Sequence, residues 1–261
     1  METAPLYFTF IGFLGIFIFV LILVGILFMI RGIQRKFNNL IIAGIGFLSL
    51  SIGFLGNFVF NLGEFFQEIC VFICITSTVV FTNLTFYKDQ NNGKNLIMII
   101  TISLGLMQLF LFLIILVGNI NIYYLRVSLD VPYNMIPFLW MAYASFSAFK
   151  KLQSKDIQPW IKVRYKLVSI FSTLISFNNI PEFFQPKGVQ WGDPSNPISL
   201  TVFGIMAVLA LLFSVGFGLA WLMPKWFKKL LNKDYEEVLD IEISEEQLMR
   251  NIQDELKKGL D

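Results

Sequence analysis

The feature that most constrains this chain is a series of apolar stretches, each about as long as a bilayer is thick. A bilayer core of about 30 Å needs roughly 20 mostly apolar residues per helix. Seven such stretches occur, at about 6–30, 40–62, 69–87, 96–120, 132–149, 160–179 and 198–223. They lack the period-two alternation of barrel strands, which favours helices. We therefore predict an all-α, polytopic membrane protein with a bundle of seven transmembrane helices.

The overall composition also indicates that the bilayer is the solvent. The chain is 56% hydrophobic and 15% charged, and its mean hydropathy is +0.69, which lies outside the range of soluble globular domains. The first stretch is too long for a signal peptide and has no positive residues before it, so we expect it to be retained. We expect residues 1–223 to form the transmembrane domain, and 224–261 a basic segment, an acidic linker and a cytosolic helix.

Positive charge is segregated between the two sides of the predicted bundle. One side carries 18 of the 20 Lys and Arg residues, leaving only Arg126 and Lys187 on the other. The segment 149–166 alone contains six basic residues and one acid. Short cytoplasmic loops retain positive charge, so we predict an external N-terminus and a cytosolic C-terminus, in the plasma membrane. Lys162, Arg164 and Lys166, at the start of the sixth stretch, are expected to reach the lipid headgroups.

Several chemistries are disfavoured by what the chain lacks. It contains no histidine, which excludes imidazole catalysis, histidine-ligated haem and most zinc-hydrolase sites. Cys70 and Cys74 lie four residues apart in an apolar stretch, where we expect packing and no metal site. No charged residue is expected near the middle of a span, which disfavours ion pumps and intramembrane catalysis. We therefore predict a non-enzymatic protein without a cofactor, a metal or a nucleic-acid partner.

Uncharged polar and acidic residues gather in the predicted outer half. The side chains of Asn57 and Asn61 lie on one helical face that leads towards Glu64 and Glu68. The group Tyr123, Tyr124, Arg126 and Asp130 precedes the fifth stretch. The candidate ligand-binding residues are Asn57, Asn61, Glu64, Glu68, Tyr133, Asn134, Trp140, Asn178, Asn179 and Glu182. An aromatic belt with helix-capping amides is the alternative interpretation.

The external segment that follows the sixth stretch is expected to be irregular. Pro181 should end that helix near Asn179, because a proline ring blocks the helical hydrogen bond. Segment 184–197 contains three prolines and two glycines, which favour a shaped loop.

The predicted cytosolic end combines a membrane-binding segment with a short helix. Lys225, Lys228, Lys229 and Lys233 follow the last stretch and are expected to contact anionic lipid headgroups. Further on, Ser244 and Gln247 have capping-box spacing, which predicts a helix at 245–258. The apolar stripe of that helix, Leu248, Ile252 and Leu256, is expected to dock on a protein partner, a second copy of the chain or the protein's own loops.

Seven spans with an external N-terminus resemble seven-helix receptors and sensory modules in topology. The resemblance stops there, because residues 198–223 contain no lysine for a retinal Schiff base, and the Asp-Arg-Tyr and Asn-Pro-x-x-Tyr motifs are absent from the matching helix ends. We predict a sensor or receptor-like module that passes a signal to a separate cytosolic or membrane partner. The alternatives are a transporter or channel-like subunit for an uncharged solute and a non-catalytic structural subunit of a membrane complex.

Overall fold

The protein is described by a computed structural model that covers residues 3–87, 92–118, 122–154, 157–189, 191–193 and 195–233. Within these ranges every regular element is helical. The elements are α1 (Thr3–Arg35), α2 (Asn38–Phe58), α3 (Glu64–Phe86), α4 (Asn92–Gly118), α5 (Tyr123–Gln153), α6 (Pro159–Ser176), the 3₁₀ helix η1 (Ile180–Phe184), α7 (Pro197–Leu222) and α8 (Lys225–Leu231). The predicted helix at 245–258, with Leu248, Ile252 and Leu256, lies outside the described residues.

Five of these helices, α1, α2, α3, α4 and α7, are long and apolar enough to cross a membrane. The all-α membrane class predicted from the sequence is therefore confirmed. Helices α5 and α6 contain more charged residues, with Arg126, Asp130, Lys150 and Lys151 in α5 and Lys162, Arg164 and Lys166 in α6. The crossing of the membrane by α5 and α6 stays a prediction.

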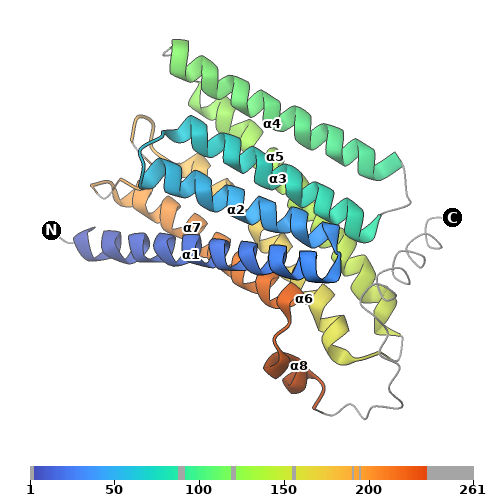
Figure 1. Ribbon diagram of the computed structural model, residues 1–261. Helices are drawn as coiled ribbons and strands as arrows, with labels where there is room; N and C mark the ends of the chain where they lie inside the picture. The colour runs from blue at the N-terminus through green and yellow to red at the C-terminus, as the bar shows by residue number, and fades with distance from the viewer. Residues whose placement is uncertain are drawn as a thin grey trace.

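The long helices form one bundle. Helix α1 packs between α2 and α7, and α3 packs against α2, α4 and α5. Helices α5 and α6 pack against each other and α6 also contacts α7, while α4 lies at one edge of the bundle (Figure 1). On the α2–α3 contact, a Cβ added to Gly53 would lie 2.6 Å from the Cβ of Cys70. Close approach of these two helices therefore requires glycine at this position.

Several helix ends differ from those predicted. Helix α3 begins at Glu64 instead of residue 69, after Gly63 with φ 87°. Helix α5 begins at Tyr123 instead of residue 132, because Pro132 and Pro137 are accommodated inside it. Helix α6 ends at Ser176, and Pro181 lies in the first turn of η1, where its missing N–H leaves no helical bond unmade. The acidic residues expected in the loop before α3 are consequently helical.

The loop before α7 is irregular, as its composition predicted. Gly188 and Gly192 have φ of 74° and 75°, a region that glycine adopts without steric strain. Ser199 Oγ accepts hydrogen bonds from Gln185 Nε2 at 2.9 Å and from the N–H of Gly192 at 3.0 Å. Asn196 then caps α7, because its Oδ1 accepts from the N–H groups of Ile198 and Ser199 at 3.1 Å.

The end of α7 is held by two guanidinium groups. Arg164 is 2% exposed, its Nε donates to the carbonyl of Ala220 at 3.2 Å, and its guanidinium lies over the Trp221 ring at 5.3 Å. Arg31 Nη1 donates to the carbonyls of Trp221 at 2.9 Å and Leu222 at 2.6 Å. These carbonyls belong to the last turn of α7, where helical partners are missing. Arg164 therefore lies inside the bundle, not among the headgroups as the sequence predicted.

Helix α8 follows this capped end. Lys225, Lys229 and Lys233, three of the predicted lipid-contacting residues, are exposed. The fourth, Lys228, is half-buried, and its Nζ lies 3.8 Å from the centre of the Trp160 ring. Helix α8 thus contacts α6 through a cation–π interaction.

Replacing the buried guanidinium should destabilise the fold. We expect Arg164→Leu to lower the free energy of unfolding by about 2 kcal/mol or more, because a charge-assisted hydrogen bond is lost. Lys166→Leu, at an exposed position of the same helix, should change it by no more than about 0.5 kcal/mol. Unfolding in mixed micelles would measure both values, and an equal loss in the two variants would contradict a structural role for Arg164.

Candidate functional site

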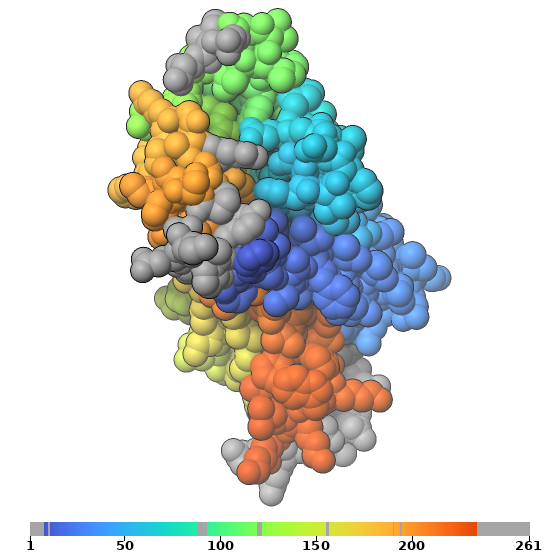
Figure 2. Space-filling view, turned by 90° about the vertical axis from the view of Figure 1, so that its left-hand side faces the viewer, coloured from blue at the N-terminus to red at the C-terminus, as the bar shows by residue number. Residues whose placement is uncertain are grey.

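A cavity of about 550 Å³ lies between α1, α2, α3, α5, η1 and α7. Glu64 and Gly188 line it and are exposed, so they mark its rim. This rim belongs to the end of the bundle where the segment before α7, in orange, lies near α3, in cyan (Figure 2). The volume lies within the range of small-molecule pockets, roughly 300–1,000 Å³.

The deep end of the cavity is closed by aromatic rings. Phe47 and Phe213 line it, and both stack on Phe217, with ring centres 5.6 and 5.3 Å apart. Below them Phe217 packs edge-on against Phe81 at 5.6 Å, and Phe81 against Trp221 at 5.1 Å. A void beside these rings measures only about 10 Å³. The cavity therefore ends near the middle of the bundle.

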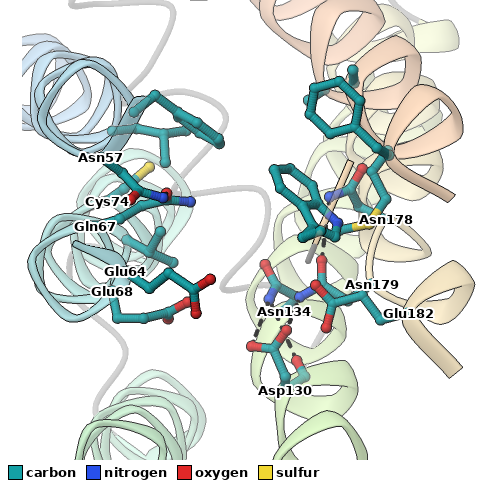
Figure 3. Close-up of a pocket in the computed structure, with 18 of the residues that line it drawn as sticks. Asn57, Glu64, Gln67, Glu68, Cys74, Asp130, Asn134, Asn178, Asn179 and Glu182 are labelled. Atoms are coloured by element: carbon teal, nitrogen blue, oxygen red, sulfur yellow. Dashed lines mark hydrogen bonds between the residues drawn. The ribbon is translucent and has the colours of Figure 1, made fainter. Parts of the chain in front are cut away.

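Four carboxylates line the end of the cavity near its rim. Glu64 and Glu68 extend from α3, while Asp130 from α5 and Glu182 from η1 occupy the opposite wall (Figure 3). Arg126 is the one cation among the described residues that line the cavity. Its Nη2 lies 3.9 Å from Glu182 Oε2, and its guanidinium lies over the Phe112 ring, 4.7 Å from its centre. Carboxylates therefore outnumber cations four to one.

Side-chain amides hold some of these groups in place. Asp130 accepts hydrogen bonds from Asn179 Nδ2 and from Asn134 Nδ2, the latter at 3.4 Å. On the opposite wall Asn57 Nδ2 donates to Gln67 Oε1 at 2.7 Å, which joins α2 to α3. Tyr123 Oη donates to the backbone carbonyl of Glu182 at 2.9 Å and so ties η1 to α5. The cavity walls are thus fixed by contacts between different helices.

Other polar groups have no such bonds. Within the described residues, the carboxylates of Glu64 and Glu68 form no hydrogen bond. Glu182 Oε2 and Asn178 Oδ1 are buried, also without a hydrogen-bond partner in this part of the chain. Unsatisfied buried acceptors are rare in folded proteins, so these atoms indicate where a ligand could donate hydrogen bonds.

Glu182 lies outside the long helices, and the pKa of its carboxyl group is raised. Its burial, together with the neighbouring Asp130 carboxylate, raises its pKa from the ordinary 4.5 to about 8, although the Arg126 guanidinium acts in the opposite direction. On the exposed loop before α7, hydrogen bonds from Ser195 lower the pKa of Asp193.

The structure brings together seven of the ten residues proposed from the sequence. The cavity is lined by Asn57, Glu64, Glu68, Asn134, Asn178, Asn179 and Glu182. The other three are elsewhere. Asn61 is exposed in the turn after α2, with φ 57°, and Tyr133 is 1% exposed with its hydroxyl close to Gly105 of α4.

Trp140 lies towards the opposite end of the bundle. It comes seventeen residues after the start of α5, which is about 25 Å along a helix. Its ring stacks on Tyr87 at 4.5 Å, and its Nε1 donates to Asn83 Oδ1 at 3.0 Å. Sequence analysis placed Trp140 near the outer rim because it assumed that α5 begins at Pro132.

Sequence analysis missed several residues that line the cavity. They include Gln67, Cys74 and Thr78 on α3, Trp191 in the loop and Ser214 on α7. Helical spacing would have found Gln67 if α3 had been extended to Glu64. The small polar residues deep in α3 and α7 give no comparable signal, because such residues also mediate ordinary helix packing.

The comparisons with known proteins add no assignment. No family model, no curated protein and no solved structure matches this chain. Near its rim the cavity offers oxygen atoms that can accept hydrogen bonds or contact a cation. At its deep end it offers aromatic surface.

The shifted acidity of Glu182 predicts a pH-dependent stability. The folded state binds this proton more tightly than the unfolded state, so its stabilisation is full below about pH 4.5 and is lost as the pH rises through about 8. The charged groups that face Glu182 are Arg126 and Asp130 from α5 and Glu64 from α3. We expect the melting temperature in detergent to fall over this range, and Glu182→Gln to flatten the fall.

Asp193→Asn is the matched control, because Asp193 is a partly exposed acid in the loop before α7, near the same end of the bundle. It should leave the pH profile between about 5 and 9 unchanged. A Glu182→Gln variant that keeps the full wild-type slope would show that Glu182 does not carry the proton.

Proposed function

We propose that this protein is a seven-span sensor or receptor-like module of the plasma membrane. It binds a small molecule from the outer side and passes a signal to a separate partner. The observation that carries the proposal is the blind cavity, which reaches the surface at the rim formed by Glu64 and Gly188 and is closed below by stacked phenylalanine rings. A site open to one side suits recognition, whereas conduction needs a continuous path.

The charge distribution supports an outward-facing cavity. Arg126 and Lys187 are the basic residues of the cavity end. The opposite end includes Arg35 at the end of α1 and Lys36 directly after it, Lys150 and Lys151 at the end of α5, and the lysines of α8. Because positive charge is retained in the cytoplasm, this asymmetry favours a cytosolic α8 and an external cavity.

Helix α7 offers a physical connection between the two sides. It lines the cavity through Phe203, Ala207 and Phe213. Its last carbonyls are held by Arg31 and Arg164, directly before α8. A ligand that moves α7 would therefore change the position of α8 and of the segment that follows. The predicted docking helix at 245–258 would carry this change to the partner.

Transport is the second candidate function. It is favoured by the carboxylates on the cavity walls, since ionisable groups inside membrane proteins often mark substrate pathways. Sequence analysis disfavoured ion pumps because it expected no charged residue near the middle of a span, and it kept a transporter for an uncharged solute as an alternative. A transporter would have to open the aromatic floor towards the cytosol. A residue on the cavity wall would then be accessible from both sides of the membrane in a transporter, but only from the outside in a receptor.

Cysteine accessibility tests the orientation and the one-sided site together. In a Cys70→Ser/Cys74→Ser background, we expect a membrane-impermeant thiol reagent to label Asn57→Cys, on the cavity wall, and Ser195→Cys on intact cells. Ser154→Cys, in the exposed turn after α5, should react only in inside-out vesicles.

Labelling of Ser154→Cys on intact cells would reverse the orientation. Labelling of Asn57→Cys from both sides, with Ser154 and Ser195 each reacting from one side only, would instead favour alternating access and hence transport.

A further inference from the structure

We propose that the cavity binds an organic ammonium ion with an apolar, preferably aromatic, body. The ammonium group would lie between the carboxylates of α3 and those of α5 and η1, with the body directed towards the aromatic floor. This inference rests on the proposed function, because it assumes that the cavity takes a ligand from the outer side.

The excess of negative charge is the first reason. The single cation, Arg126, is occupied by Glu182 on one side and by the Phe112 ring on the other. Asp130 already accepts hydrogen bonds from Asn134 and Asn179. Glu64 and Glu68 face this group across the cavity (Figure 3) and form no hydrogen bond within the described residues. Protonation of Glu182 relieves part of this repulsion, and a second cation would balance the carboxylates that stay ionised.

The unsatisfied atoms on the walls are the second and independent reason. The Glu182 side chain is only 12% exposed, and its Oε2 has no hydrogen-bond partner in the described part of the chain. Asn178 Oδ1, on the same wall, is also buried and accepts no hydrogen bond there. The oxygen of an ionised Glu182 and the amide oxygen of Asn178 are both acceptors, so the missing group is a donor that takes the place of the Glu182 proton. An ammonium group supplies up to three N–H donors together with the positive charge.

The spacing of the carboxylates argues against a bare metal ion. No three acidic or cysteine side chains among the described residues lie close enough to hold one ion. Calcium needs six to eight oxygen ligands at about 2.3–2.6 Å, whereas these carboxylates occupy opposite walls (Figure 3). A cation with several N–H groups and some bulk fits this arrangement better.

The depth of the cavity selects the rest of the ligand. Apart from the carboxylates, the cavity walls include the rings of Phe17, Phe54, Phe138, Phe203 and Trp191. Trp191 packs edge-on against Phe203 at 4.6 Å, and Phe17 against Phe54 at 5.4 Å. Such rings bury apolar groups and also stabilise a nearby cation through their π faces. An amine with an aromatic body would use both parts of the cavity.

Three indole compounds that differ in one terminal group provide the test. Tryptamine carries an ammonium, tryptophol a hydroxyl and indole-3-propionate a carboxylate. Calorimetric titration of the purified full chain in neutral-lipid nanodiscs at pH 7 should show tryptamine binding at least about tenfold more tightly than tryptophol, because its hydrogen bonds are charge-assisted. Indole-3-propionate should bind most weakly.

Two variants test whether the preference for tryptamine over tryptophol arises in the cavity. Glu68→Gln should weaken tryptamine binding about tenfold while leaving tryptophol within about twofold. Asp193→Asn removes an exposed carboxylate near the same end of the protein and should leave both affinities unchanged. The melting temperature of each variant shows that it is folded.

The outcomes separate this inference from the proposed function. Equal affinity for the amine and the alcohol would overturn the cationic ligand class and keep the cavity as a binding site. A preference for tryptamine that persists in full in Glu68→Gln would overturn the placement of its ammonium. No saturable binding of any of the three compounds at millimolar concentration would overturn both proposals.

Discussion

Polar groups inside a bilayer must find partners within the protein, and the two ends of this bundle meet that requirement differently. At the α8 end, Arg31 and Arg164 cover the final carbonyls of α7, and each of these guanidinium groups is tied to the backbone of another helix. At the other end, Glu64 and Glu68 point into a cavity without such bonds. One end is thus closed by its own side chains, while the other presents hydrogen-bond acceptors to a cavity.

The core between the cavity and the α8 end of the bundle is packed with aromatic rings. Phe28, Phe81 and Phe217 are fully buried beneath the cavity and contact one another through Phe217. Close-packed rings resist gradual deformation, so a shift of α7 at the cavity would be transmitted as a movement of the whole helix. Because α7 both lines the cavity and ends at the guanidinium pair, it is the element best placed to link the cavity to the α8 end of the bundle.

Sequence reasoning predicted the membrane class and the order of the long helices because apolar stretches of about 20 residues are an unambiguous signal. It was less successful at helix ends. Glu64 and Asp130 were assigned to loops because a charged residue normally ends a membrane span, yet both lie in helices whose polar faces line a cavity. Arg164 was expected among the headgroups, but tertiary contacts with Ala220 and Trp221 place it inside.

The candidate site shows the same limit. Asn57, Glu68 and Glu182 were recognised as polar residues of one half of the protein, and the structure places all three on one cavity. Trp140 was grouped with them only because the start of α5 was misplaced. The excess of carboxylates over cations could not be predicted, because it depends on η1 folding back beside α5 and opposite α3.

The central claim is that the carboxylates are present for a ligand and not for stability. The most direct measurement is the melting temperature of Glu68→Leu in neutral detergent at about pH 8, because an apolar group there replaces a carboxyl group that forms no hydrogen bond within the described residues and so removes its desolvation cost. We predict a melting temperature equal to or above that of the wild type. A fall of several degrees would show that Glu68 stabilises the fold and would contradict this account.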